Sequence, residues 1–245
     1  MEDIVVGRLS QALKAFFPKC HHRCDFFGHQ ASLLRLKQLG FEPRIVYDVG
    51  AHRGDWTKGA SEIFPGAEFI LFEANSDHAE HLKATGRRFF IAALASKDLP
   101  NKPFFLPKQG STTGASFYLE DTPYYADENL ITRSIPTARL DSLVRENRLP
   151  LPQLIKFDIQ GAEIDAMNGA PESLADCNSL ITEVALVTYN KGAPLFGDVV
   201  SWIGQRGFFC VDICEVHRWK NDCIFQMDLL FVREPLFRKF CSLGL

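Results

Sequence analysis

After Arg44, short apolar runs alternate with segments of helical periodicity, and this alternation restricts the folds open to the chain. The apolar runs are RIVYDVG, FILFEAN, RRFFIAAL, LIKFDIQ and SLITEVAL, at 44–50, 69–75, 87–94, 154–160 and 179–186. Helical patterns lie between most of them, at 55–63, 77–85, 163–174 and 197–205. This order predicts an α/β fold with a mainly parallel sheet covered by helices on both faces. Two later runs, GFFCVDI and CIFQMDLLFV, predict a terminal antiparallel pair.

Two regions depart from the alternation. Residues 1–40 carry two apolar faces of helical spacing, so we expect an N-terminal helical cap on a main domain at 41–245. The first face comprises Ile4, Val5, Leu9, Leu13 and Phe16, and the second comprises Leu33, Leu34, Leu36 and Leu39. Residues 100–137 are rich in proline and contain a Gly-Ser-Thr-Thr-Gly run. We predict that this insertion forms a lid or short hairpin where a substrate would be covered.

Composition narrows the function classes. The 245 residues include 27 Lys+Arg and 30 Asp+Glu, a formal net charge of −3 that gives little attraction to nucleic acid. With 46% hydrophobic residues and no apolar run near the ~20 residues that span a bilayer, we expect an ordered protein without a membrane span. The first residues have no basic leader, so we expect a cytoplasmic protein with reduced cysteines. The run from Cys20 to Cys24 fits no usual zinc spacing, and we expect no metal site.

The end of the first predicted strand combines a carboxylate with a glycine turn. Asp48 is followed by Gly50 and Gly54, which permit a tight turn before the helical pattern at 55–63. Ligands of open α/β sheets bind beyond the carboxyl ends of the strands, so this turn lies at the expected crevice. His52 occupies the position of a middle glycine, and Asp48 repels pyrophosphate. S-adenosylmethionine, which bears an ammonium and a sulfonium group, fits such a turn better than a dinucleotide.

Two further motifs place charge at strand ends. Glu73 ends the second strand, where an acid can accept hydrogen bonds from both ribose hydroxyls of a nucleoside or can simply cap the next helix. Lys156 and Asp158 lie two positions apart in the fourth run and therefore point to the same side. Charges in a buried parallel strand need partners or a function. A salt bridge and a catalytic site both remain open for this pair.

Five segments in this order resemble the FkbM-type S-adenosylmethionine-dependent methyltransferases, over nearly everything from Arg44 to Glu234. They are IVYDVGAHRGDWT, FILFEANSDHAEHLK, IPTARLDSLV with LIKFDIQGAEIDAMNGA, TEVALVTYNKGAPLFGDVVSWIGQRGF and FQMDLLFVRE. The resemblance implies a Rossmann-like class I methyltransferase fold, whose seven-stranded sheet has an antiparallel last strand. It also implies methyl transfer, generally to a hydroxyl oxygen of a small molecule or sugar.

The resemblance also implies roles for single residues. The positions that would hold the methionine end, ribose and adenine of the cofactor are Asp48, Gly50, Ala51, His52, Gly54, Glu73, Asn75, Ala92 and Ala93. The signature next to the transferred methyl group is matched by Lys156, Asp158, Gly161 and Glu163, of which Asp158 would also contact the cofactor. Two positions depart from the family pattern: His52 is often asparagine there, and Gln160 replaces a usual acid.

Methyl transfer to an alcohol is helped by a positioned base, because an alcohol is a poor nucleophile at neutral pH. We predict that Asp158 accepts or orients the hydroxyl proton, while Lys156 and Glu163 set the local charge. Glu183, at the end of the fifth strand, is a second candidate base. The predicted acceptor contacts are Ser116, Tyr118, Tyr189 and His217, for which a polar loop and a solvated histidine are the alternatives.

Two other function classes remain open. One is a nicotinamide-dependent oxidoreductase on a similar fold, and the other is a non-catalytic nucleotide-binding module, since fold alone does not establish activity. The expected partner is a small-molecule or glycan acceptor, not a nucleic acid or a membrane. A homodimer is compatible with these features, and the sequence does not specify the oligomeric state.

Overall fold

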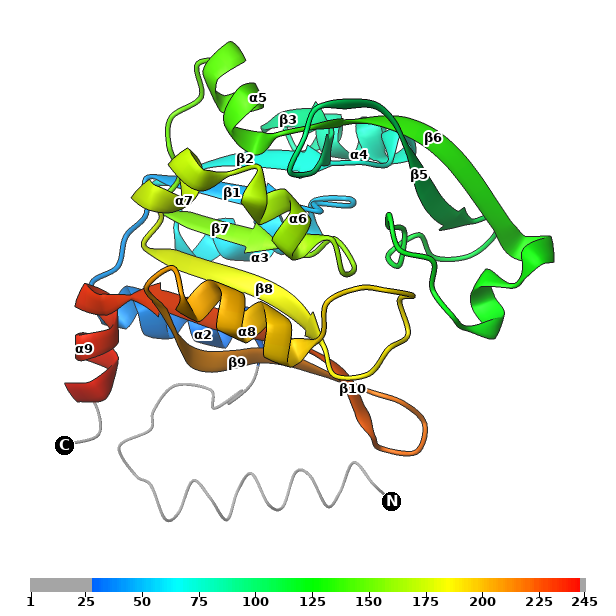
Figure 1. The fold of residues 1–245 in the computed structure, drawn as a ribbon. Helices are drawn as coiled ribbons and strands as arrows, with labels where there is room; N and C mark the ends of the chain where they lie inside the picture. The colour runs from blue at the N-terminus through cyan, green and yellow to red at the C-terminus, as the bar shows by residue number, and fades with distance from the viewer. Residues whose placement is uncertain (1–27, 243–245) are drawn as a thin grey trace.

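The fold is built on a seven-stranded sheet, seen in the computed structural model, which describes residues 28–242 (Figure 1). Its strands run in the order β3-β2-β1-β7-β8-β10-β9. In that order they span Arg88–Ile91, Glu68–Glu73, Ile45–Val49, Leu154–Phe157, Ser179–Ala185, Ile224–Arg233 and Phe208–Arg218. The first five are parallel, and β10 is antiparallel to both β8 and β9. The predicted sheet, with its antiparallel last strand, is confirmed.

Helices cover both faces of this sheet, as expected (Figure 1). One face packs against α2 (His29–Gln38), α3 (Asp55–Ile63), α4 (Ala79–Ala84) and α9 (Glu234–Ser242). The other face packs against α5 (Leu140–Glu146), α6 (Glu163–Asn168), α7 (Pro171–Asp176) and α8 (Phe196–Gly204). Neighbouring residues of β1 therefore enter different cores: Val46 joins the α2–α3 side, whereas Tyr47 joins the α5–α8 side. Two buried faces explain why the strands are continuously apolar.

The third apolar run does not form one strand. It is divided into β3 and β4 (Ala93–Leu94), because β4 leaves the main sheet and pairs with β6 (Leu130–Ala138). β6 in turn pairs antiparallel with β5 (Leu99–Pro107) in a second, three-stranded sheet. The insertion at 100–137 is therefore a hairpin with long strands. Its connection contains two 3₁₀ turns, η2 (Pro123–Tyr125) and η3 (Asp127–Asn129).

Several expected helices differ in detail. The pattern at 163–174 forms two helices, α6 and α7, because Pro171 has no N–H to continue a helix and restricts the residue before it. The pattern at 77–85 begins with a 3₁₀ turn, η1 (Ser76–His78), before α4. Leu33 and Leu36 of α2 are buried, but Leu34 is 47% exposed and does not belong to the apolar face. Helices α5 and α9 were not predicted.

The N-terminal region is described only in part. The first predicted helical face, Ile4 to Phe16, and the Cys20–Cys24 run lie outside the described residues. Helix α2, the second part of the expected cap, packs against α3 and β9. The cysteines that the structure describes are free thiols. Between residues 28 and 242, no helix is both long and apolar enough to cross a membrane.

Candidate active site

A cavity of about 800 Å³ lies at the carboxyl ends of the central parallel strands, a volume typical of small-molecule sites. Asp158 follows β7, in the middle of the strand order, and we divide the cavity lining into two parts on either side of it. We call the first part the β2 side, which is lined by Gly50, His52, Glu73, Ala92 and Ala93. The second part, the β10 side, is lined by His29, Trp56, Glu183, Glu215, His217 and Asp228. The cavity occupies the point where the chain order reverses around β1, as expected for an open α/β sheet.

The glycine turn after β1 holds the floor of the cavity in place. Gly50 has a φ of 83°, and its N–H donates to the carbonyl of Phe72 on β2. A Cβ atom at Gly50 would stand 1.9 Å from the carbonyl oxygen of Asp158. Gly54, with a φ of 86°, begins α3. The turn therefore joins β1, β2 and the end of β7 through backbone contacts, and a side chain at position 50 would leave no room for them.

We expect Gly50→Ala to destabilise the fold by at least about 3 kcal/mol, because it combines a left-handed backbone with an overpacked contact. Urea denaturation of the variant and of wild type measures the change. Gly66→Ala is the matched control, since a Cβ at Gly66 meets nothing within 4 Å. Equal loss of stability in both variants would contradict the close-contact explanation.

Asp48 and Ala51 are part of this turn but do not line the cavity. Asp48 is fully buried, and its Oδ2 accepts a hydrogen bond of 2.6 Å from the Thr57 hydroxyl of α3. Burial raises the pKa of this carboxyl, against the charge of Lys156 beside it. Its contacts show Asp48 tying β1 to α3, and the direct cofactor contact predicted for it is not seen in the cavity lining.

Glu73 is held at the cavity wall by two backbone donors. Its Oε2 accepts from the N–H of His52 and its Oε1 from the N–H of Asn75, each at 2.7 Å. Burial raises the pKa of Glu73 to about 7, despite these two hydrogen bonds. Each carboxylate oxygen can accept more than one hydrogen bond. The carboxylate is therefore fixed in position and still able to accept from a pair of ligand hydroxyls.

The insertion closes over the β2 side through a threonine. The hydroxyl of Thr112 lies 3.2 Å from Nε2 of His52 and 2.9 Å from Nε2 of His78. The two imidazole rings lie 4.0 Å apart. Burial lowers the pKa of both rings, that of His78 to about 4, so both are neutral at neutral pH. The insertion thus contributes to the wall of the cavity, and its action as a lid stays a prediction.

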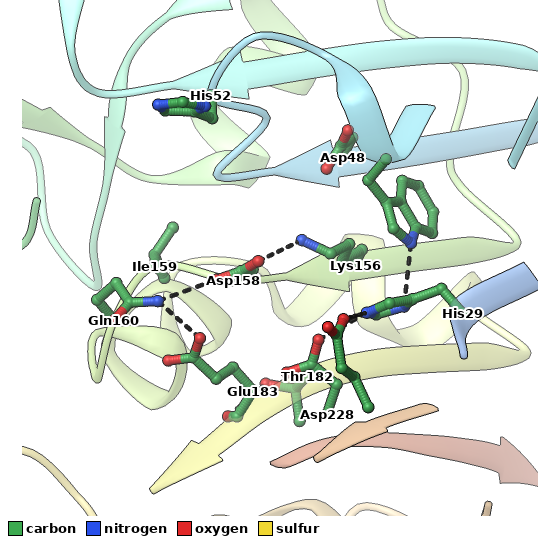
Figure 2. Close-up of polar contacts among 12 residues, drawn as sticks. His29, Asp48, His52, Lys156, Asp158, Ile159, Gln160, Thr182, Glu183 and Asp228 are labelled. Carbon is green, nitrogen blue, oxygen red and sulfur yellow. Dashed lines mark hydrogen bonds and ion pairs between the residues drawn. The ribbon is translucent and has the colours of Figure 1, made fainter. Parts of the chain in front are cut away.

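Lys156, Asp158 and Glu183 come together as predicted, and Gln160 joins them (Figure 2). Lys156 Nζ donates to Asp158 at 2.6 Å, and the amide of Gln160 donates to Asp158 at 3.2 Å and to Glu183 at 2.6 Å. Burial opposes ionisation of Asp158, but the charge of Lys156 outweighs it and lowers the pKa. Burial and the charge of Asp158 raise the pKa of Glu183 well above its ordinary value. The surroundings therefore favour the ionised form of Asp158 and the protonated form of Glu183.

Glu163 lies behind this group. Its carboxylate accepts from the backbone N–H groups of Ile159 and Gly161, at 3.0 and 3.2 Å, and it does not line the cavity. These bonds hold the turn that follows β7, in which Gln160 has a φ of 56°. The structure therefore shows Glu163 supporting the shape of the turn, and its influence on the reaction stays a prediction.

The buried carboxyl of Glu163 makes stability depend on pH. Burial raises its pKa from 4.5 to about 7, so it favours the fold fully below about pH 4.5, and this contribution is lost as the pH rises through about 7. The loss is on the order of 3 kcal/mol. We expect Glu163→Gln to reduce the fall in unfolding free energy between about pH 5 and about pH 8, measured by urea denaturation. The exposed Glu172→Gln is the control, and an unchanged pH slope in the Glu163 variant would contradict the interpretation.

The predicted acceptor residues have different environments. Ser116 is buried, and its hydroxyl donates to the carbonyl of Gln160 at 2.8 Å, which anchors the insertion to the turn after β7. Tyr189 donates to the Gln226 side chain at 3.0 Å. Ser116, Tyr189 and His217 line the cavity, whereas Tyr118 does not and lies near Gly161. Asn75 is also absent from the lining, and its side-chain oxygen accepts from Arg133.

Several residues of the β10 side were not identified from the sequence. Nε2 of His29 lies 2.6 Å from Asp228 (Figure 2). The same atom lies 3.4 Å from Glu215, and the Trp56 indole donates to Nδ1 of His29 at 3.1 Å. His29, Glu215 and Asp228 bring three potential metal-ligand atoms within 4.8 Å of one another, although no metal site was expected. A charge inside the apolar run of β10 was the signal for Asp228. Nothing in the pattern around His29 indicates a contact 199 residues away.

Comparison with known proteins assigns the chain to a family. Residues 48–210 match the model of the methyltransferase FkbM domain. The chain belongs to the FkbM methyltransferase family. The hexuronic acid methyltransferase AglP of Haloferax volcanii is 25% identical over 167 residues, which are 65% of this chain. The match covers 64% of that relative, less than two thirds of its length.

Two solved structures illustrate the similarity of the fold of this FkbM family member to other proteins. A magnesium protoporphyrin IX methyltransferase from Synechocystis PCC 6803 with bound SAM has a TM-score of 0.47 and 11% identity, over 84% of this chain and 76% of that one. A 1,6-didemethyltoxoflavin-N1-methyltransferase from Burkholderia thailandensis has a TM-score of 0.45 and 10% identity, over 93% and 89%.

Family membership indicates S-adenosylmethionine as the cofactor, and the residues of the FkbM domain fit it. Glu73 offers a fixed carboxylate at the β2 side, where a ribose diol can donate to it. The cavity is lined by seven carboxyl groups and, among the residues that the structure describes, by one lysine and no arginine. Such a lining attracts a cofactor with a sulfonium and an ammonium group. It repels the pyrophosphate of a dinucleotide.

Proposed function

We propose that the protein transfers the methyl group of S-adenosylmethionine to a hydroxyl oxygen of a sugar or a related small molecule. The observation that carries the proposal is the carboxylate of Asp158, which Lys156 and Gln160 hold at the cavity wall beside Glu183. A hydroxyl needs a group that accepts its proton, and an ionised carboxylate supplies one. The name of the Haloferax relative, a hexuronic acid methyltransferase, supports a sugar as the acceptor.

The β2 side would hold the cofactor. Glu73 would accept from the ribose hydroxyls, Ala92 and Ala93 would line the space for the adenine, and Gly50 and His52 would lie nearest the methionine end. Thr112 would close this side through its contacts with His52 and His78. We assign Asp48, Ala51, Gly54 and Asn75 the supporting role of shaping this wall, because none of them lines the cavity.

We assign to Asp158 the role of binding the acceptor hydroxyl and accepting its proton. When bound, S-adenosylmethionine supplies a methyl carbon made electrophilic by its sulfonium sulfur. Asp158 would accept a hydrogen bond from the acceptor hydroxyl, align its oxygen with that carbon, and take the proton as the new C–O bond makes the hydroxyl strongly acidic. A low-pKa carboxylate is basic enough at that stage. Lys156 keeps Asp158 ionised, and Gln160 fixes the spacing between Asp158 and Glu183.

We also propose that the methyltransferase domain begins before the predicted boundary at residue 40 and includes helix α2. His29 of α2 lines the cavity, and Leu33 and Leu36 of the same helix are completely buried in the core shared with α3. This part of the predicted cap therefore belongs to the methyltransferase domain, with the hairpin at 100–137 as its cover.

The position of the transferred methyl group tests the proposed function. The protein is incubated with S-adenosylmethionine labelled with ¹³C in the methyl group and with a panel of simple glycosides. We expect S-adenosylhomocysteine to form together with a product whose labelled carbon has the NMR shift of an O-methyl ether. A labelled methyl group on nitrogen or carbon would contradict the proposal, and so would a panel in which no glycoside is methylated.

A further inference from the structure

The β10 side of the cavity carries acidic groups to which the proposed reaction gives no role. The carboxyl groups that line the whole cavity are Asp55, Glu73, Glu120, Asp158, Glu183, Glu215 and Asp228. Lys156 neutralises Asp158 through a 2.6 Å ion pair, and burial and the charge of Asp158 raise the pKa of Glu183, which favours its neutral form. Two acids of the β10 side, Glu215 and Asp228, have no lysine or arginine partner among the described residues.

Asp228 on β10 and Glu215 on β9 are paired directly opposite each other in the antiparallel register of these two strands. The Asp228 side chain is 5% exposed, whereas that of Glu215 is 48% exposed, so the pair extends from the buried wall towards the open part of the cavity. Asp228 Oδ1 is buried and has no hydrogen-bond donor among residues 28–242. A buried carboxylate oxygen without a donor is costly, and Asp228 therefore has unused capacity to accept a hydrogen bond.

His29 contacts both acids but satisfies the pair only in part. Its Nδ1 accepts from the Trp56 indole, so in this arrangement its single proton is on Nε2, which faces Asp228. Burial lowers the pKa of His29, but hydrogen bonds with Asp228, Cys214 and Glu215 raise it to about 11. The two carboxylates therefore favour the doubly protonated form of His29. In that form Nδ1 would also carry a proton, which would point at the N–H of Trp56. A cation that binds the carboxylates directly removes this conflict.

The same contact decides between two kinds of cation. A metal ion would need the lone pair of His29 Nε2, and the ring proton would then have to be on Nδ1, against the Trp56 N–H. An ammonium group makes no such demand, because it donates hydrogen bonds to the two carboxylates and leaves the histidine as it is. Trp219 and Phe225, which stack with ring centroids 5.4 Å apart on the same side of the cavity, offer the apolar surface that a sugar ring uses.

We propose that the acceptor is an amino sugar, whose protonated amine binds Asp228 and Glu215 while a hydroxyl of the same molecule faces Asp158. This inference rests on the proposed function and adds the charge of its substrate. It also separates this chain from its Haloferax relative, because a hexuronic acid would bring a second anion into a cavity with no free lysine or arginine among the described residues.

Calorimetric binding to the protein saturated with S-adenosylhomocysteine tests this without turnover. The probes are glucosamine, N-acetylglucosamine and glucuronic acid, in a buffer that contains EDTA. We expect glucosamine to bind at least about tenfold more tightly than N-acetylglucosamine, and glucuronic acid to bind most weakly, because only glucosamine gives a charged hydrogen bond to the acids. The inference would be overturned if the three sugars bound with equal affinity or if glucosamine did not bind. It would also be overturned if the preference for glucosamine appeared only in a buffer with a divalent metal and no EDTA.

Two variants locate the amine. Glu215→Gln, at a half-exposed position, and Asp228→Asn should each remove most of the preference for glucosamine and leave the affinity for S-adenosylhomocysteine unchanged. Asp121→Asn, which removes an exposed acid paired with Lys191 outside the cavity lining, should keep the preference. Retained preference in Glu215→Gln would overturn the assignment. Methyl transfer from the ¹³C-labelled cofactor then separates the two proposals: a methyl group on the amine contradicts O-methylation, even where the amine site is supported.

Discussion

Replacing Asp158 with asparagine is expected to lower kcat by on the order of a hundredfold, since the variant cannot accept the proton of the acceptor hydroxyl. The amide keeps the size of the side chain and can still accept a hydrogen bond from Lys156 at one oxygen. Binding of S-adenosylhomocysteine should change little, because Glu73 and the glycine turn lie on the β2 side of the cavity. Steady-state kinetics with an accepted glycoside gives kcat and KM separately.

The ion pair between Lys156 and Asp158 requires a control for charge and stability. Asp165→Asn removes the acid of another lysine–aspartate pair, Lys102 with Asp165 at 2.7 Å, which lies outside the cavity lining. We expect kcat to stay within about twofold of wild type in this control. A circular dichroism melt checks that both variants are folded. If folded Asp158→Asn keeps its turnover, Asp158 does not take the proton.

Replacing Glu73 with glutamine is expected to weaken the binding of S-adenosylhomocysteine by on the order of a hundredfold. The carboxylate accepts from His52 N and Asn75 N and has capacity left for two ribose hydroxyls, and each hydrogen bond to a charged group is worth about 1.5–3 kcal/mol. A glutamine side chain has only one oxygen that can accept hydrogen bonds. Its NH₂ group would face one of the two backbone N–H donors that Glu73 now accepts from. Isothermal titration calorimetry measures the dissociation constant.

Glu68→Gln is the matched control for Glu73, because Glu68 begins the same strand and is exposed. It should leave the affinity unchanged. Equal affinities of Glu73→Gln and wild type for S-adenosylhomocysteine would remove Glu73 from the ribose site and leave the cofactor's position in the cavity without its main support.

Much of the sheet could be predicted from local patterns. Runs such as LIKFDIQ and SLITEVAL are buried on both faces, so every residue in them reports burial, and the strands β7 and β8 lie inside those limits. Acids at the ends of such runs, Glu73, Asp158 and Glu183, all line the cavity. Because the carboxyl ends of parallel strands lie at one edge of a sheet, the positions of these three acids in the sequence were enough to predict that they lie at the same edge.

The remaining features depend on contacts between distant parts of the chain. The run at 87–94 divides because β4 pairs with β6, more than 40 residues away, and no local pattern records that pairing. His29 enters the site because α2 packs against α3 and β9, so its partner Asp228 lies 199 residues ahead. The split of 163–174 into α6 and α7 was within reach of the sequence, since Gly169 and Pro171 interrupt the helical pattern there.

Calorimetric titration of the wild-type protein with S-adenosylhomocysteine and, separately, with NAD tests the central claim most directly. We expect S-adenosylhomocysteine to bind at one site per chain and NAD not to bind, because the acidic cavity accepts a cationic cofactor and repels a pyrophosphate. Binding of NAD without binding of S-adenosylhomocysteine would contradict it.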